Sequence, residues 1–123
     1  MTPQTTNLMK MCSRWGLEVL GVETILSPKE RGLRHAEEAI ELAQALGVTK
    51  TQMTALVKQV YGKEPGEPTQ EVAGSLFTLY VLCDVLSIDP EIALRAELER
   101  VSDPEVKAKC VAKQATKVRA VGV

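Results

Sequence analysis

Residues 69–87 read TQEVAGSLFTLYVLCDVLS, and this stretch decides the fold. If it is helical, apolar side chains fall on nearly every side of the helix from Val72 to Leu86, a pattern typical of a helix surrounded by others. Patterns that alternate apolar and polar residues, as strands do, are nearly absent from the chain. We therefore predict an all-α protein in which residues 69–87 form the central, buried helix.

Capping residues, prolines and glycines mark further helices. Ser27 can cap a helix that has Pro28 at its first position, and Glu30 can complete a capping box with Ser27. Gly47 can then take the left-handed conformation that closes the helix. The pair Thr49 and Gln52 predicts another capping box. The helix it starts runs to about Gly62, and cap-plus-proline pairs at 89–90 and 103–104 predict helices over about 90–101 and 104–119.

The N-terminal residues have a weaker helical pattern. Apolar residues between about 6 and 15 occur at mixed helical spacings, and Gly16 and Gly21 bracket a predicted loop. No repeat or domain boundary is visible. We expect one domain over residues 1–123, with 1–24 as an N-terminal segment and about five to six helices in all.

The bulk composition excludes several classes of protein. The 123 residues are 45% apolar and 25% charged, with a formal net charge of −1, so there is no global attraction to nucleic acid or to an anionic membrane. One Trp, two Tyr and one Phe make a base-stacking surface improbable. We expect neither nucleic acid nor a membrane as a partner.

The cysteines and the apolar runs indicate the compartment. Cys12, Cys83 and Cys110 are odd in number and widely spaced, which argues against disulfides and a zinc site. The longest apolar run, residues 76–86, is too short to cross a bilayer, and the first twenty residues lack the apolar core of a signal peptide. The expected compartment is the cytoplasm, or the host cell cytoplasm if the protein is phage-encoded.

Charged residues form one line on the helix that follows Ser27. Arg31, Arg34, Glu38 and Glu41 are spaced by three, four and three residues, so they share a face. Guanidiniums suit bidentate phosphate binding, and carboxylates suit a hard divalent cation. A metal-bound triphosphate needs both. The alternative is a solvated helix face with ion pairs inside the helix, such as Arg34 with Glu38.

Two later helices can add to this line. Glu71 belongs to the only polar stripe on residues 69–87, and a buried carboxylate there needs a positive partner such as a metal ion. Alternatively, Glu71 lies in the first turn at the solvent edge and complements the helix dipole. Lys113 and Lys117, four residues apart, can share a face over phosphates, or can simply suit the C-terminal end of their helix.

These residues resemble the MazG-like all-α nucleoside triphosphate pyrophosphohydrolases, which carry E-x-x-E on one helix and E-x-x-D on a later one. The matching residues here are Glu38-Ala39-Ile40-Glu41 and Glu71-Val72-Ala73-Gly74. The context from about residue 25 to 120 is similar to the phage MazZ-like dATP/dGTP branch. The segments that carry this likeness are Glu30-Arg31, Arg34, Glu37 to Leu42, Tyr61, Gly66-Glu67-Pro68, Gln70-Glu71-Val72, Lys113-Gln114-Ala115 and Lys117.

The resemblance implies a metal-dependent hydrolase that cleaves the α–β phosphoanhydride of a purine nucleoside triphosphate, dGTP or dATP, releasing the monophosphate and pyrophosphate. Mg²⁺, or Mn²⁺, would be held by Glu38, Glu41 and Glu71, and Glu38 would act on the attacking water. Arg31, Arg34, Lys113 and Lys117 would bind phosphates. The fold implied is a MazG-like helical bundle completed as a homodimer or homotetramer.

One residue departs from the general motif. Gly74 stands where the family has aspartate, inside a helix where glycine costs roughly 1 kcal/mol relative to alanine. Either Glu67 or water replaces the missing ligand, with the nucleotide or a water approaching the helix backbone, or the chain has lost catalysis and only binds nucleotides.

Two non-enzymatic readings stay open. The first is a catalytically impaired nucleotide-binding protein or an oligomeric helical interaction module, in which residues 69–87 serve assembly. The second is a helix-turn-helix regulator that uses residues 49–62, although Lys50 and Lys58 are a thin footprint for duplex DNA.

Overall fold

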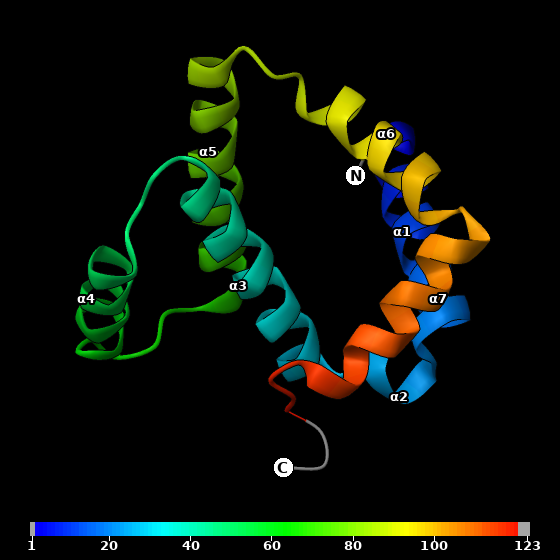
Figure 1. The fold of residues 1–123 in the computed structure, drawn as a ribbon. Coiled ribbons are helices and arrows are strands. Elements are labelled where there is room, and N and C mark those ends of the chain that lie inside the picture. Colours follow the sequence, from blue (N-terminus) through cyan, green and yellow to red (C-terminus); the bar gives the residue numbers. More distant parts are fainter. Residues whose placement is uncertain (1, 121–123) are drawn as a thin grey trace. The chain divides into compact units, whose positions relative to one another are not determined.

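The computed structural model describes residues 2–120, apart from the side chain of Gln4. These residues form seven α-helices and one 3-10 turn, and no strand, so the prediction of an all-α chain is confirmed (Figure 1). The helices are α1 (Pro3–Leu20), α2 (Val22–Ile25), α3 (Pro28–Ala45), α4 (Lys50–Tyr61), α5 (Pro68–Leu86), α6 (Pro90–Val101) and α7 (Pro104–Lys113), followed by the 3-10 turn η1 (Gln114–Thr116).

The N-terminal prediction is wrong in two respects. The first helix runs from Pro3 to Leu20 instead of from about 6 to 15, and its N-cap Thr2 accepts a hydrogen bond from the backbone N–H of Thr5. Gly16 lies inside this helix and is buried, because a Cβ there would overlap the side chain of Ile25. The predicted loop is therefore a close contact between α1 and α2, and only Gly21, at φ 85°, breaks the helix.

Most helix starts and stops follow the predicted caps. Thr49 and Gln52 form the complete capping box of α4, and Gly47 closes α3 at φ 90°. Asp89 and Asp103 accept backbone hydrogen bonds at the starts of α6 and α7. The α5 helix, however, begins at Pro68, one residue before the predicted start, and its N-cap is Glu67, whose carboxylate accepts from the N–H of Gln70 at 3.0 Å.

The C-terminal helix is shorter than predicted. It ends at Lys113, the chain continues as a 3-10 turn, and Lys117 is extended at φ −84° and ψ 152°. Lys113 and Lys117 therefore do not share a face of one helix. Lys117 instead begins an extended segment, residues 117–120, which we call the C-terminal strap.

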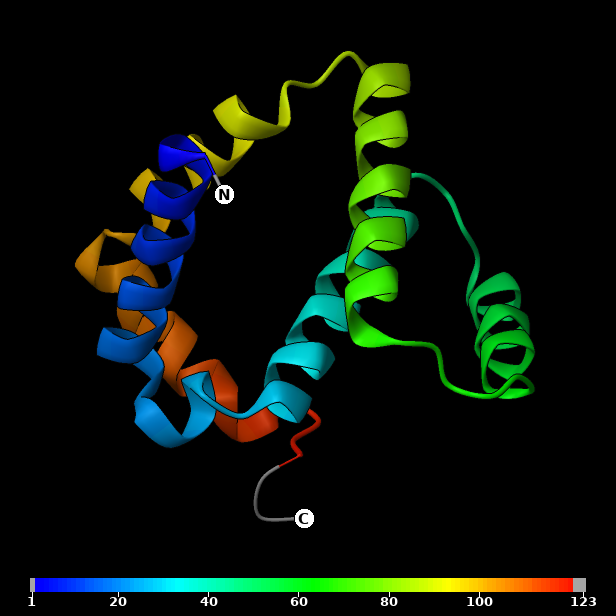
Figure 2. The ribbon, with the colours of Figure 1, turned by 180° about the vertical axis from the view of Figure 1, so that it is seen from behind.

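The described chain divides into two compact units, residues 2–38 with 95–120 and residues 39–94, and the divisions fall within α3 and α6. In the first unit α1 lies alongside residues 95–101 of α6 and alongside α7 (Figure 1 and Figure 2). The indole N–H of Trp15 on α1 donates to the carbonyl of Val101 at 2.7 Å, and Lys107 on α7 pairs with Glu18 at 3.1 Å. These contacts tie the chain's two ends together.

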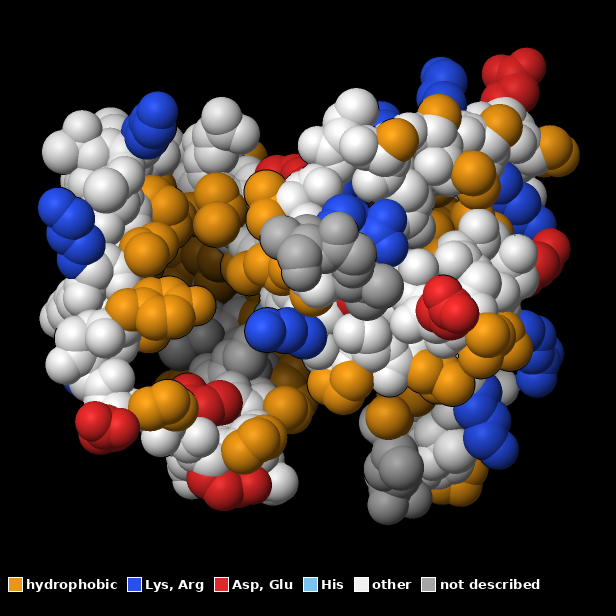
Figure 3. Space-filling model, turned by 90° about the horizontal axis from the view of Figure 1, so that it is seen from below, with side chains coloured by type: hydrophobic (Ala, Val, Ile, Leu, Met, Phe, Trp, Pro, Cys, Tyr) orange, Lys and Arg blue, Asp and Glu red, His pale blue; other side chains and the backbone are white. Residues whose placement is uncertain are grey.

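The second unit overturns the prediction of a buried central helix. No residue from 39 to 94 is buried, and on α5 the side chains of Phe77 and Val85 are 72% and 74% exposed. The apolar sequence forms the predicted helix, but no neighbouring helix of the unit surrounds it. Across the described residues no apolar side chain is buried, and hydrophobic side chains lie open on the face drawn in Figure 3.

The sequence predicts that the longest apolar run is too short to cross a bilayer. Among the described helices, none is by itself both long enough and apolar enough to cross a bilayer; α5 and α6 meet the criterion only as a bent pair.

Candidate phosphate-binding cluster

The cationic half of the predicted line lies on the first turns of α3, within the first unit. Arg31 and Arg34 are both largely covered, and the Arg34 side chain is only 16% exposed. The Nη2 group of Arg34 donates to the carbonyl oxygen of Val118 in the strap, 84 residues away in sequence. The other predicted phosphate-binding residues thus approach α3 from the C-terminal end of the chain.

Two carboxylates of α3, those of Glu30 and Glu37, hold the strap in place. The ammonium of Lys117 donates to Glu37 at 2.5 Å. Glu30, whose side chain is fully buried, accepts from Arg119 Nε at 2.5 Å and from the backbone N–H of Ala120 at 2.9 Å. Arg119 also donates to the hydroxyl of Thr24 at 3.3 Å.

Glu30 has a second role beyond the predicted cap of α3. Ser27 does accept from the N–H of Glu30 at 3.2 Å, as expected for a cap. The Glu30 carboxylate binds Arg119 and Ala120, 89 and 90 residues away in sequence, a role that the capping pattern did not predict. Nothing local in the sequence could indicate a contact across that separation.

The guanidiniums have hydrogen-bonding capacity that the protein leaves unused. Nε and Nη2 of Arg31 and Nε and Nη1 of Arg34 are buried without a hydrogen-bond acceptor, and so is the carbonyl oxygen of the Gln114 side chain without a donor. A buried donor with no acceptor is costly, and native proteins keep few of them. Four such nitrogens on two adjacent arginines mark a place where an acceptor with several oxygens would be favoured.

The neighbouring charges shift the pKa values of Arg31 and Glu37. Burial lowers the pKa of Arg31, Glu30 opposes the shift, and the positive charges of Arg34 and Arg119 lower it further. The hydrogen bond from Lys117 lowers the pKa of Glu37, and the charges of Lys117, Arg34 and Lys113 add to that effect. We call Arg31, Arg34, Lys113 and Lys117, the four predicted phosphate-binding residues, the cationic cluster, and Arg119 of the strap lies beside it.

The carboxylates predicted to bind metal are exposed, unlike the largely covered arginines of the cationic cluster. Glu38, Glu41 and Glu71 are all exposed, and Glu71 lies in the first turn of α5, as the solvent-edge alternative requires. The carboxylate of Glu38 is near Arg100 on α6, whose pKa is raised mainly by Glu97 and to a smaller degree by Glu38. Within residues 2–120 no three Asp, Glu, His or Cys side chains gather closely enough to hold a metal ion.

The loop before α5 places both Glu67 and Glu71. The carboxylate of Glu67, the possible extra ligand, caps α5, and its pKa is lowered by the backbone N–H groups of Thr69 and Gln70. The carboxylate of Glu71 lies directly against Gly66, where a Cβ would overlap Oε1 and lie 3.1 Å from Cδ. Gly66 thus leaves the space that the Glu71 carboxylate occupies.

Gly74, the departure from the family motif, faces open space. A Cβ built there has no heavy atom within 4 Å beyond the helix's own backbone, and the hydroxyl of Thr78 donates to the Gly74 carbonyl at 3.0 Å. No packing contact requires glycine at this position, so an aspartate would fit.

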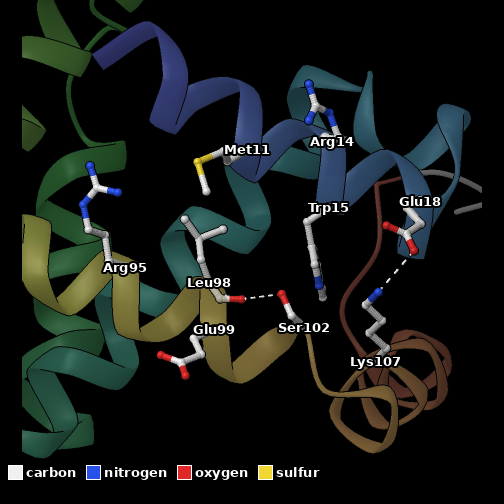
Figure 4. A pocket seen from close by; sticks show the side chains of 9 residues that line it. All are labelled: Met11, Arg14, Trp15, Glu18, Arg95, Leu98, Glu99, Ser102 and Lys107. Atoms are coloured by element: carbon white, nitrogen blue, oxygen red, sulfur yellow. Dashed lines mark hydrogen bonds and ion pairs between the residues drawn. The ribbon is translucent and has the colours of Figure 1, made fainter. Parts of the chain in front are cut away.

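A separate hollow of about 460 Å³ lies in the first unit between α1, α6 and α7 (Figure 4). Its lining combines apolar and charged side chains, namely Met11, Arg14, Trp15, Glu18, Arg95, Leu98, Glu99, Ser102 and Lys107. None of the predicted site residues belongs to it.

Comparison with protein-family models, curated proteins and solved structures finds no match to this chain.

Proposed function

We propose that the chain is a nucleoside triphosphate pyrophosphohydrolase that uses the cationic cluster to bind the phosphate chain of its substrate. The observation that carries the proposal is the unused hydrogen-bonding capacity of Arg31 and Arg34, next to Lys113 and Lys117. Arginines bind phosphate oxygens bidentately, and these hydrogen bonds are stronger than those to neutral acceptors. The purine and deoxyribose preference, dGTP or dATP, rests on the resemblance alone.

The proposed reaction cleaves the bond between the α and β phosphates and releases pyrophosphate. The cationic cluster would stabilise the negative charge that develops on the leaving pyrophosphate, which is where electrostatic clamps contribute most in phosphoryl chemistry. Glu38, one turn beyond Arg34 on α3, would orient or deprotonate the attacking water. Its carboxylate is exposed and therefore open to water.

The proposal includes Mg²⁺ or Mn²⁺, with Glu38, Glu41 and Glu71 as ligands. Glu38 and Glu41 stand one turn apart on α3 and are of the type that hard cations prefer. Glu71, in the first turn of α5, would be the third ligand. A bound metal ion would supply charge neutralisation and a more acidic water.

Association with further copies of the chain is part of the proposal. Chains of this length usually bury about two-thirds of their unfolded surface, yet no apolar side chain is buried here among the described residues. Hydrophobic burial is the main term that offsets the conformational entropy lost on folding. A homodimer or homotetramer that covers the exposed side chains of α5, such as Phe77 and Val85, would supply it.

Pyrophosphate release tests the enzyme. The protein is incubated with each common NTP and dNTP in Mg²⁺ or Mn²⁺, with EDTA as the blank. The proposal is supported if EDTA abolishes pyrophosphate release and the Lys113→Ala variant releases pyrophosphate more slowly than the wild type. Lys109→Ala, on the same helix but without an assigned role, is the matched control and should keep full activity. No release with any nucleotide would reject the enzyme.

The second candidate is a non-catalytic helical interaction module, or a nucleotide-binding protein that has lost catalysis. The exposed apolar surface of α5 favours the module, because exposed patches of this kind mark interaction sites. Assembly through α5 without pyrophosphate release and without nucleotide binding identifies the module; nucleotide binding without release identifies the impaired enzyme.

A further inference from the structure

The C-terminal strap, residues 117–120, lies over the two arginines that we propose bind phosphate. The carbonyl oxygen of Val118 accepts from Arg34 Nη2, and the charge of Arg119 is close enough to lower the pKa of Arg31. In this arrangement a backbone oxygen of the chain itself occupies the position at which Arg34 would bind an oxygen of a ligand.

The remaining donors are out of reach of any ligand. The unused nitrogens of Arg31 and Arg34 are buried, so neither water nor a phosphate oxygen in solution can approach them without movement of the covering residues. The strap supplies part of that cover, since Val118 contacts Arg34 directly. The described arrangement is therefore a closed state of the cationic cluster.

We propose that the strap is an autoinhibitory latch, and that a phosphate chain binds Arg31 and Arg34 by displacing it. This inference rests on the phosphate site of the proposed function. The exchange is favourable for the arginines, because a neutral carbonyl satisfies one donor of Arg34, whereas a di- or triphosphate offers several charged oxygens to four buried nitrogens that make no hydrogen bond. One of these, Arg34 Nη1, lies 3.8 Å from the Glu37 carboxylate, too far for a hydrogen bond.

Two ion pairs oppose release of the strap, and their strength sets the ligand concentration at which the strap is displaced. The Lys117–Glu37 pair is the weaker, because both side chains are partly exposed, at 25% and 32%, and water screens it. On release, Lys117 can exchange Glu37 for a phosphate oxygen. The Arg119–Glu30 pair is the stronger, because the Glu30 carboxylate is fully buried and also holds the Ala120 amide.

Hydrogen exchange of the strap, measured during titration with inorganic pyrophosphate, tests the latch in the full chain. The amide of Ala120 is the reporter, since it donates to the buried Glu30. We expect its protection to fall as pyrophosphate binds. Unchanged or increased protection at saturating pyrophosphate would overturn the latch while leaving the phosphate site intact.

Variants that loosen the strap should bind pyrophosphate more tightly in calorimetry. If the strap is closed in about nine molecules in ten, its loss tightens the apparent Kd about tenfold. Glu37→Gln and Arg119→Ala are the test variants, and Lys107→Ala, which breaks the unrelated pair with Glu18, is the control. Circular dichroism checks the fold. Should Arg119→Ala misfold, Glu37→Gln still decides, because it leaves the Glu30 anchor in place.

The Ala120 exchange rate of Glu37→Gln without ligand separates the two ways in which that variant could gain affinity. Faster exchange shows that the strap has loosened and supports the latch. Tighter binding without faster exchange reflects only the loss of a negative charge, and it overturns the latch. Weaker binding by both variants also overturns it. If neither the wild type nor any variant binds pyrophosphate, the proposed phosphate site itself is wrong.

Discussion

Replacement of Arg119 by alanine should destabilise the first unit far more than an ordinary surface substitution does. Glu30 has no exposed surface, whereas Arg119 is 25% exposed, and their side chains meet at 2.5 Å. Removing one partner of a buried ion pair generally costs about 3–5 kcal/mol, because the other charge is left without compensation. The partial exposure of Arg119 and the Ala120 amide that Glu30 keeps reduce our expectation to about 2–3 kcal/mol.

A double-mutant cycle isolates the ion pair from other effects of the substitution. Glu30→Gln retains the shape and removes the charge, and we expect it alone to cost about 1–2 kcal/mol. In the double variant no carboxylate is left stranded, so its cost should be about 2 kcal/mol instead of the additive value of about 4 kcal/mol. The coupling energy would then be about 2 kcal/mol.

Urea unfolding at neutral pH, followed by tryptophan fluorescence, measures the effect in the correct unit. Trp15 is the only tryptophan and lies in the same unit as Glu30 and Arg119. Lys107→Ala, which removes the exposed pair with Glu18, should cost at most about 1 kcal/mol and serves as the control. A loss below about 0.5 kcal/mol for Arg119→Ala, or strict additivity in the cycle, would refute the reasoning.

Three further predictions address other parts of the chain. Gly66→Ala should displace the carboxylate of Glu71 and weaken Mn²⁺ binding about tenfold in calorimetry without loss of helicity. The hydrogen bond from Lys117 lowers the pKa of Glu37 in the folded protein. The stability that this pair contributes is therefore complete above the ordinary carboxyl pKa of 4.5 and is lost as the pH falls through the lower folded pKa. The hydrogen-exchange protection of the strap should fall over the same pH range. Phe77→Asp, on exposed α5, should dissociate the oligomer in sedimentation experiments.

Each of these has a matched control or a contrary result. Gly32→Ala, where a Cβ meets nothing within 4 Å, should leave Mn²⁺ affinity unchanged. Glu37→Gln should abolish the acid-dependent loss of strap protection, and persistence of that loss would assign it to another group. Leu26→Asp, 70% exposed but outside α5, should leave the oligomer intact, and dissociation by both variants would reject α5 as the specific interface.

Local signals account for the parts of the fold that were predicted well. Caps such as Thr49, Asp89 and Asp103 act on backbone groups two or three residues away, so the sequence contains both partners. The same logic failed near Gly16, because glycine can mark either a loop or a close contact between helices, and only the position of Ile25 distinguishes them.

In the candidate site, too, features set within one helix could be predicted, and features that depend on distant contacts could not. The spacing of Arg31 and Arg34 within one helix is a local property, and the line on α3 could therefore be predicted. The burial of Glu30 and its pairing with Arg119 depend on a contact between residues 89 apart in sequence, and no local sequence pattern indicates such a contact. Glu71 lies in the first turn of α5, far along the chain from Glu38 and Glu41 on α3, so no local pattern could place it relative to them.

The sequence by itself determined that this protein is helical, where most of its helices begin and end, and that α5 is apolar on nearly all sides, because these follow from side chains acting on their own turn. Only the tertiary structure decided that α5 stays exposed, that α7 ends at Lys113, and that the strap closes over Arg34. These outcomes depend on contacts between residues far apart in the chain, whose free energies no local pattern encodes.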